Sequence, residues 1–216
     1  MAHLEPLTRE QLPALEPMLA ASEAMMGFVP NSMLTMAYMP QLNVAFTLLA
    51  GTVFGNDLQP TLQAAAQAVP TDENADQALA PELLQLIAYA SSLAAGCQYC
   101  QAHTSHNAHR FGLSDEKLNE VLNFADSAVY SSAEKAVIDI AMAAGQVPNG
   151  TESAHFDALK EHFSQRQIVQ IVATISLFGF LNRWNDTMAT ALEDMPMDFA
   201  ASALGPSGWQ AGKHGS

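Results

Sequence analysis

Apolar and polar positions along the chain follow the spacing of α-helices almost throughout. The segment ELLQLIAYASSLAA, residues 82–95, is apolar over much of a helical circumference, which is typical of a buried helix. Residues 31–39 and 41–55 also have a helical pattern, and Pro40 separates them. No stretch of useful length alternates apolar and polar residues in the way a half-buried strand does. The pattern therefore predicts an all-α fold.

Several helix boundaries carry start and stop signals. Pro81 fits the first turn of a helix, and Gly96 fits the end of the same helix. The next helix is expected from about Cys97 to Phe111, with Gly112 after it. The polar residues 71–77 are expected to form a loop. Three capping boxes are predicted, at Thr8 with Gln11, Ser131 with Glu134, and Ser164 with Gln167.

The length of 216 residues is sufficient for a substantial hydrophobic core without disulfides or metals. We expect a single helical domain over residues 1–216, with a loose tail at 204–216. Charged residues make up 14% of the chain, which is little for a fully solvated surface. We therefore expect part of the surface to be hidden in a homo-oligomer: a dimer, trimer or hexamer.

The net charge of −14 argues against nucleic acid and anionic membranes as partners, because both attract basic surfaces. The first residues lack the basic start and apolar core of a signal peptide. The most apolar window, residues 168–181, is too short and too polar to span a membrane. We expect a cytoplasmic protein without a membrane segment.

Both cysteines of the chain lie in the motif GCQYC, residues 96–100. On a helix, Cys97, Cys100 and His103 fall within an arc of roughly 120° and can face one small space. A thiolate at a helix start is favoured by the helix dipole, and Cys97 is best placed for that. Cys100 is best placed to share a proton with His103. The spacing indicates thiol redox chemistry and leaves open which thiol attacks.

Other uses of the cysteine pair are less well supported by the sequence. Haem attachment requires a histidine directly after the second cysteine, and that position is Gln101. A structural zinc site would need two further ligands from His103, His106 and His109, but consecutive turns of one helix poorly enclose a tetrahedral ion. Two inert buried thiols remain an alternative, because free cysteine is commonly buried. We expect no metal and no cofactor.

Residues 94–118, AAGCQYCQAHTSHNAHRFGLSDEKL, resemble the core of the carboxymuconolactone decarboxylase-like superfamily, most closely its AhpD-like, peroxidase-related branch. The segment ISLFGFLNRWNDTMAT, residues 175–190, is similar to the C-terminal part of that branch. The resemblance implies an all-helical AhpD-like bundle in homo-oligomers. It also implies a thiol-dependent peroxidase or disulfide reductase that meets a hydroperoxide and an external thiol or dithiol reductant. Cys100 would attack and Cys97 would resolve.

The sequence departs from that family in the expected proton relay. The family's histidine slot, four residues after the second cysteine, holds Thr104, and His103 comes one residue earlier. The family's glutamate slot holds Gln85, which cannot take up a proton, and Glu82 lies one turn before it. Glu82 either substitutes for the missing glutamate or is simply a carboxylate at a helix start. The expected catalytic set is therefore Cys97, Cys100 and His103, with Gln85 and Glu82 at the relay position.

Two further functions are alternatives to thiol redox catalysis. One is a lyase of the carboxymuconolactone decarboxylase type, and the other is a non-enzymatic redox or metal-binding module. The segment RWND, residues 183–186, is charged and aromatic within an apolar helix, and was interpreted as a buried ion pair or a subunit contact.

Overall fold

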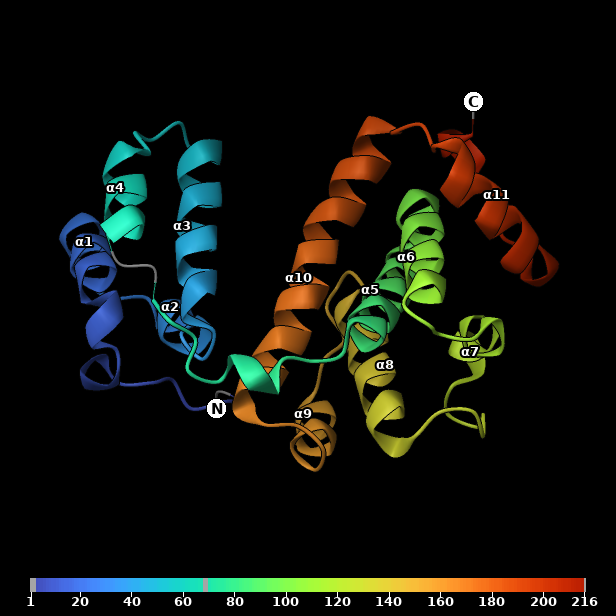
Figure 1. Ribbon diagram of the computed structural model, residues 1–216, viewed down its shortest axis with the longest axis horizontal. Coiled ribbons are helices and arrows are strands. Elements are labelled where there is room, and N and C mark those ends of the chain that lie inside the picture. The colour runs from blue at the N-terminus through green and yellow to red at the C-terminus, as the bar shows by residue number, and fades with distance from the viewer. Residues whose placement is uncertain (1–2, 68–69, 216) are drawn as a thin grey trace. The chain divides into compact units, whose positions relative to one another are not determined.

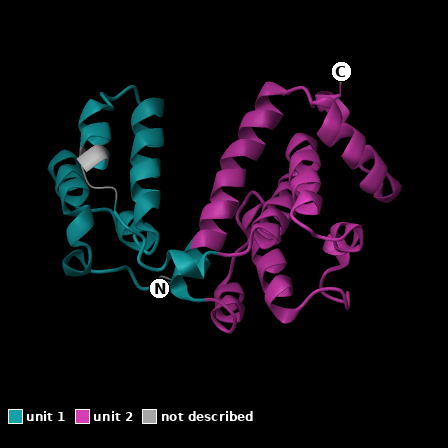
Figure 2. Cartoon of the chain, viewed as in Figure 1, with its two compact units in different colours: residues 1–78, 164–169 teal, residues 79–163, 170–216 magenta. Residues whose placement is uncertain are grey.

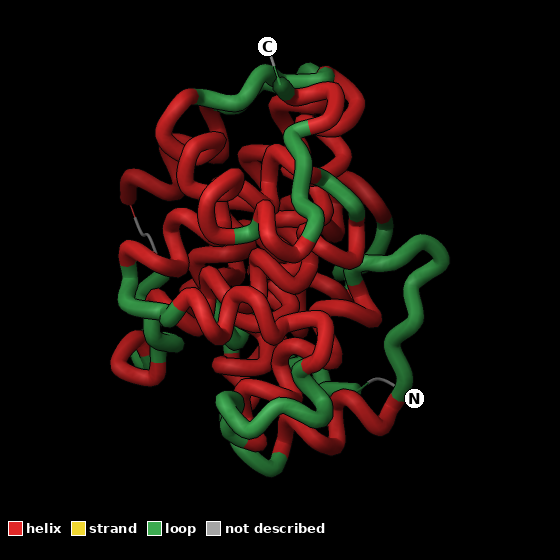
Figure 3. Tube along the Cα trace, turned by 90° about the vertical axis from the view of Figure 1, so that its right-hand side faces the viewer, coloured by secondary structure: helices red, strands yellow, loops and turns green. Residues whose placement is uncertain are grey.

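The computed structural model describes residues 3–67 and 70–215. Residues 1–2, 68–69 and 216 lie outside the described part, and residue 216 is the last of the tail expected to be loose. Within the described ranges the chain forms helices and loops and no strand (Figure 3). The prediction of an all-α fold is confirmed.

The chain divides into two compact units, where the sequence predicted one domain over residues 1–216 (Figure 2). Unit 1 consists of residues 1–78 and 164–169, and unit 2 consists of residues 79–163 and 170–216. Helix α10 (Gln165–Met188) begins in unit 1 and continues in unit 2. Both cysteines belong to unit 2, so the candidate site is built within that unit alone.

Unit 1 is a small helical cluster. Its core consists of Leu12, Leu15, Leu19, Met33 and Ala37. The segment 71–77, expected to be a loop, contains the short 3-10 turn η3 (Ala75–Gln77). The unit contains α1 (Glu16–Met26), α2 (Asn31–Met36), α3 (Pro40–Val53) and α4 (Gln59–Gln67), preceded by the 3-10 turns η1 (Arg9–Gln11) and η2 (Pro13–Leu15).

Unit 2 is organised around α5 (Pro81–Ala95), in which seven consecutive residues from Leu86 to Ser92 are buried. Helix α6 (Gln98–Arg110) packs against α5 and α11, and α5 packs against α8 (Figure 1). The remaining elements of the unit are α7 (Asp115–Glu120), η4 (Val121–Asn123), α8 (Ser132–Ala144), α9 (Ser153–Lys160), α11 (Asp194–Ala203), η5 (Gly205–Ser207) and η6 (Gly212–His214).

The turn between α5 and α6 positions the two cysteines. Gly96 ends α5 with φ +74°, in the left-handed region that only glycine enters at little cost. The backbone N–H of Gly96 donates to Leu93, and that of Cys97 donates to Ser92, so the last carbonyls of α5 are satisfied. Cys97 is then extended, with φ −84° and ψ 102°, and is the N-cap residue of α6. The reversal brings the start of α6 back against α5.

The predicted helix signals agree with the structure at several boundaries. Ser131 and Glu134 form the reciprocal capping box at the start of α8: the Ser131 backbone N–H donates to the Glu134 carboxylate at 2.8 Å, and the Glu134 N–H donates to the Ser131 hydroxyl at 3.2 Å. Pro81 is the first residue of α5, as predicted. No helix in the described part of the chain has both the length and the apolar character needed to cross a membrane.

The C-terminal segment, which the sequence analysis expected to be loose, contains the two 3-10 turns η5 and η6. The side chain of His214 in η6 is fully buried. The backbone N–H of Leu192 donates to the His214 carbonyl at 2.8 Å. This segment therefore contributes to the packing of unit 2.

Candidate active site

Cys97 and Cys100 lie one turn apart at the start of α6, and neither forms a disulfide. Cys97 is the N-cap residue and Cys100 lies in the first turn, where the helix dipole favours negative charge. Both thiols are buried, with 0% and 3% of the residues exposed. The pair is thus a reduced dithiol held in a largely dry environment.

The two thiols have unequal acidity. A hydrogen bond from the Cys100 side chain lowers the pKa of Cys97 to about 7, with smaller help from the Cys100 backbone N–H and from His214, while burial opposes the shift. The same contact with Cys97, together with burial, raises the pKa of Cys100. Near neutral pH, Cys97 is the better thiolate and Cys100 the thiol that donates to it. The family resemblance had implied the reverse roles.

Helix α10 contributes an amide to the pair. The Asn185 side-chain N–H donates to Cys100 Sγ at 3.6 Å, and Asn185 itself is buried. In the same RWND segment, Arg183 and Trp184 are exposed. The segment therefore aims its third residue at the thiols, a role that its composition did not indicate.

The neighbouring Asp186 and the distant His214 complete a small polar cluster at Cys97. A ring nitrogen of His214, a carboxylate oxygen of Asp186 and Cys97 Sγ all lie within 4.8 Å of one another. Lys213 binds the other Asp186 oxygen at 2.9 Å, and this hydrogen bond lowers the pKa of Asp186. The cluster therefore combines an ionised carboxylate, an imidazole and an acidic thiol.

The atoms of this cluster are also of types that bind metal ions. A closed zinc site needs four ligands, and this group offers three. The Lys213 ammonium already neutralises Asp186 from the other side, which disfavours a second cation on the same carboxylate. We therefore do not assign these residues as metal ligands. The histidines considered for zinc from the sequence, His103, His106 and His109, are not part of the group found among the described residues.

His103, the expected proton-transfer partner, is held by other contacts. Its Nδ1 lies 3.0 Å from the backbone carbonyl oxygen of Tyr99, and its Nε2 lies 2.9 Å from Glu193 Oε2. Both ring nitrogens thus face oxygen acceptors, and neither offers a free lone pair to a thiol. The Tyr99 hydroxyl donates to the other Glu193 oxygen at 3.1 Å, and the Tyr99 and His103 rings stack with centroids 4.2 Å apart. Tyr99, His103 and Glu193 form a separate group beside the thiols.

Gln85 and Glu82, the expected relay positions, lie on α5. Glu82 is in the first turn of α5, where a carboxylate suits the helix dipole. The Gln85 side-chain oxygen is buried, and no residue of the described part of the chain forms a hydrogen bond with it. Across residues 3–67 and 70–215, no hydrogen bond or ion pair connects Glu82 or Gln85 to either thiol. Thr104, in the family's histidine slot, donates its hydroxyl to the Cys100 carbonyl at 2.6 Å.

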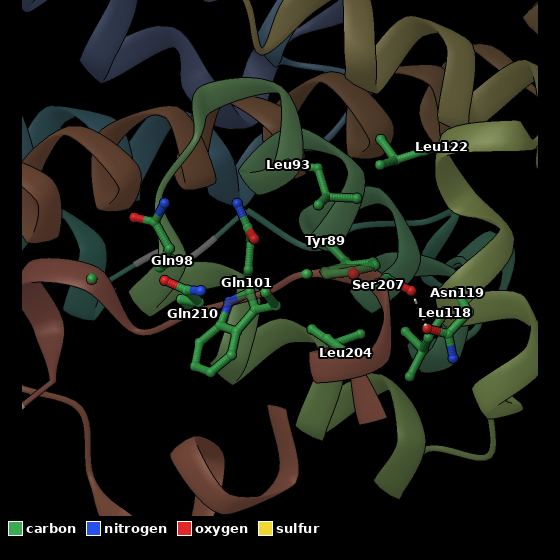
Figure 4. Close-up of a pocket in the computed structure, with 13 residues that line it drawn as sticks. Tyr89, Leu93, Gln98, Gln101, Leu118, Asn119, Leu122, Leu204, Ser207 and Gln210 are labelled. Atoms are coloured by element: carbon green, nitrogen blue, oxygen red, sulfur yellow. Dashed lines mark hydrogen bonds between the residues drawn. The ribbon is translucent and has the colours of Figure 1, made fainter. Parts of the chain in front are cut away.

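A cavity of about 450 Å³ opens beside the start of α6 (Figure 4). Gln98 and Gln101, the residues directly after each cysteine, line it. The Trp209 indole also lines the cavity, and its buried N–H has no hydrogen-bond partner among the residues that the structure describes. The other lining residues are Tyr89, Leu93, Leu118, Asn119, Leu122, Leu204, Ser207, Gly208, Gln210 and Gly212. Its volume and mixed lining suit a small organic molecule.

Comparison with known proteins identifies a family and solved relatives. The model described as the carboxymuconolactone decarboxylase family matches residues 60–143. The crystal structure of the debrominase Bmp8 in its apo form is similar with a TM-score of 0.54 at 35% sequence identity, over 92% of this chain and 96% of that chain. A cysteine-to-alanine variant of Bmp8 in complex with 2,3,4-tribromopyrrole is similar with a TM-score of 0.53 at 33% identity, over 95% and 97% of the two chains.

A peroxidase-related protein from Ralstonia eutropha JMP134, described as an alkylhydroperoxidase AhpD core, has a TM-score of 0.48 at 21% identity, over 90% of this chain and 93% of that chain. No curated protein matches the chain.

Proposed function

Because the chain belongs to the carboxymuconolactone decarboxylase family, we propose that it is a thiol-dependent reductase of that family. In this proposal the Cys97 and Cys100 dithiol delivers two electrons to an electrophilic atom of a small organic substrate. The pair ends as a disulfide, and an external thiol or dithiol reductant reopens it. The acidic Cys97 thiol beside a second free thiol, at a helix start, is the observation that carries this proposal.

The order of events follows from the acidity of the two thiols. At pH 7 a thiol with pKa of about 7 is half ionised, so Cys97 attacks first. Cys100 stays protonated until Cys97 has been oxidised and its charge is gone, because that charge raises the pKa of Cys100. Cys100 then attacks the Cys97 sulfur. We therefore favour Cys97 as the attacking thiol and Cys100 as the resolving one.

A hydroperoxide is the acceptor that the sequence analysis expected. The Cys97 thiolate attacks the outer oxygen, the O–O bond breaks, and the leaving alkoxide takes a proton to become an alcohol. Cys97 is left as a sulfenic acid. Cys100 displaces its hydroxyl as water and closes the disulfide. The relay position holds Gln85, so the chain lacks the glutamate that is expected to carry the proton in the peroxidase-related branch.

A bromine on an electron-rich aromatic ring is the acceptor favoured by the comparison with Bmp8. That debrominase shares 35% of its residues with this chain over nearly its whole length. Here the Cys97 thiolate would take bromine, the ring carbon would take a proton, and Cys100 would displace bromide from sulfur as the disulfide forms. One aryl bromide and two thiols give the arene, the disulfide and hydrogen bromide. The cavity of about 450 Å³ suits a ring of that size.

The two acceptor classes are distinguished by assay of the reduced protein with a dithiol reductant, using cumene hydroperoxide in one arm and a tribromopyrrole or bromophenol in the other. Product is followed by mass spectrometry. We expect consumption of the halide or the peroxide to depend on both cysteines. Protein alkylated beforehand with iodoacetamide serves as the control for reaction with the reductant alone.

The roles of the thiols are tested by the variants Cys97→Ser and Cys100→Ser. Cys97→Ser should lose at least a hundredfold in single-turnover rate, because hydroxyl does not ionise near pH 7. Cys100→Ser should still react once and retain a trappable oxidised Cys97. Full turnover by Cys97→Ser would disprove the proposed function, and consumption of a lactone substrate without loss of thiols would support the lyase alternative.

A further inference from the structure

His214 reaches the thiol site from η6, more than a hundred residues along the chain from the cysteines. Two backbone hydrogen bonds hold it there: its N–H donates to Ala211 at 3.1 Å, and its carbonyl accepts from Leu192 at 2.8 Å. The imidazole is fully buried. Its position is therefore set by the packing of unit 2 and is not that of a solvent-exposed surface histidine.

The contacts of the ring determine which nitrogen carries the proton. His214 Nδ1 lies 2.8 Å from the carbonyl oxygen of Thr190. A carbonyl can only accept, so Nδ1 carries hydrogen and donates. In the neutral ring the lone pair is then on Nε2. That nitrogen is buried and has no hydrogen-bond partner in the described part of the chain. A buried polar atom left unpaired is unfavourable, which indicates that Nε2 finds a partner during function.

The groups around Nε2 suit a proton exchange with Cys97. Asp186 Oδ1 lies 3.6 Å from Nε2, and a ring nitrogen lies within 4.8 Å of Cys97 Sγ. Lys213, from the same turn, binds the other Asp186 oxygen. The centroids of the Tyr99 and His214 rings lie 5.9 Å apart. Burial raises the pKa of the Tyr99 hydroxyl to about 12, so Tyr99 stays neutral near pH 7. The other titratable neighbour of Cys97 is Cys100.

We propose that His214 is the proton-transfer residue of Cys97, with Asp186 as its positioning residue. The inference rests on the proposed function, in which Cys97 is the attacking thiol. The Cys97 S–H bond breaks, its proton moves to His214 Nε2, and the electron pair stays on sulfur. Asp186 faces the resulting imidazolium and stabilises its charge. The proton then passes to the alcohol oxygen of a reduced peroxide, or to the ring carbon that loses bromine.

This assignment differs from the sequence-based expectation for His103. Both nitrogens of His103 lie within 3.0 Å of oxygen acceptors, whereas the acceptor that faces His214 Nε2, Asp186 Oδ1, lies 3.6 Å away. The remaining gap between His214 and Cys97 exceeds a hydrogen bond, and such contacts tighten when substrate binds.

The test is the pH dependence of Cys97 alkylation by iodoacetamide, read by mass spectrometry in the reduced protein and in the variant His214→Gln. Glutamine can still donate to Thr190 but cannot titrate between pH 5 and 9. We expect the midpoint of the alkylation profile to rise by one pH unit or more. At pH 7 the alkylation rate should then fall about fivefold or more, because fewer Cys97 thiols are ionised.

Three further variants make the result decisive. Asp186→Asn should shift the profile in the opposite direction, because the Asp186 charge raises the pKa of Cys97, and added imidazole should partly restore the rate of His214→Ala. His103→Gln should leave the Cys97 profile in place. An unshifted profile in His214→Gln would overturn the inference, as would an equal shift in His103→Gln. Stoichiometric zinc that is lost in His214→Gln would also overturn it, because the three groups would then be ligands.

The alkylation assay uses no substrate, so it separates the two proposals. If Cys97 is required for turnover but His214→Gln has a normal profile, only the role of His214 fails. If the profile shifts but Cys97→Ser retains turnover, the proposed function fails and the acid–base pair stands.

Discussion

At the scale of single residues, we predict that Asn185 affects the second step of the proposed reaction through its contact with Cys100. The hydrogen bond with Cys97, burial and the charge of Cys97 raise the pKa of Cys100, while the Asn185 amide opposes that shift. Replacing Asn185 by leucine keeps the volume and removes the donor at 3.6 Å. Loss of one hydrogen bond to sulfur should slow disulfide closure roughly two- to tenfold.

Closure in Asn185→Leu is measured by how much oxidised Cys97 dimedone traps before the disulfide forms. The first reaction of Cys97 should stay within about twofold of the original rate, because the Asn185 hydrogen bond goes to Cys100. The matched control is Asn182→Leu, one turn earlier on α10, where the buried amide has no hydrogen-bond partner in the described part of the chain. Slower closure in both variants, or in neither, would contradict the role of Asn185.

The residues of the site differ in how far the sequence could predict them. The sequence was sufficient to predict the spacing of Cys97 and Cys100 and their place at a helix start, because these residues are local neighbours. Asn185 lies 85 positions from its thiol partner, and His214 sits in a glycine-rich tail without a local pattern. Only folding brings them together. His103 does lie on α6 as predicted, but Glu193, the N-cap residue of α11, binds its ring, and local spacing along the sequence cannot predict that contact.

At the scale of helices, the close approach of α5 and α8 fixes the end of α5 from which the thiol turn starts. A Cβ added at Gly145 would lie 2.8 Å from the Ala94 Cβ and 2.9 Å from the Ser91 carbonyl oxygen. The variant Gly145→Ala must push the two helices apart. We expect it to lower the free energy of unfolding by about 1–3 kcal/mol and to change the reactivity of Cys97, because Gly96 follows that end of α5.

Urea unfolding followed by circular dichroism measures this effect. The control is Gly179→Ala on α10, where an added Cβ meets nothing within 4 Å. Alanine is the better helix former there, so stability should stay or rise by up to about 1 kcal/mol. Equal stability of Gly145→Ala and the unmodified protein would show that α5 and α8 have room to adjust.

Helix boundaries were the most predictable part of the fold. Pro81, Gly96, Ser131 and Glu134 act at their boundaries through local backbone chemistry, and local sequence is sufficient for that. The division into two units was not anticipated, because both are helical and no change of composition marks residue 78. The burial of His214 was not predicted because this residue lies in a glycine-rich tail without a local pattern.

At the scale of the whole molecule, an apolar stripe on α10 is the surface that we predict to form the contact in the expected homo-oligomer. Leu177, Phe180, Trp184 and Met188 are exposed in the single chain and recur at helical spacing. The Phe180 and Trp184 rings stack with centroids 6.2 Å apart. Because few charged residues are available to solvate the surface, we predict that a second copy of the chain covers this stripe.

Light scattering coupled to size-exclusion chromatography gives the mass of the assembly. Trp184→Glu should reduce it, because an unpaired carboxylate would be buried at the contact. Arg183→Glu, which introduces the same side chain at the adjacent exposed position, should leave the mass unchanged. A monomeric unmodified protein would refute the oligomer, and a Trp184→Glu protein of unchanged mass would exclude the stripe as its interface.

We predict that the near-complete burial of both cysteines limits the size of the oxidants and reductants that can react with them. Under the proposed function, small peroxides, halides and dithiols would reach cysteine residues that are 0% and 3% exposed when the surrounding chain opens transiently, whereas the thiol of a folded protein would not come within bonding distance. Mixed disulfides with bulky thiols are disfavoured in the same way. The rate at which a reductant regenerates the dithiol would then depend on how often the site opens. Large thiols, even when abundant, would not react with the pair.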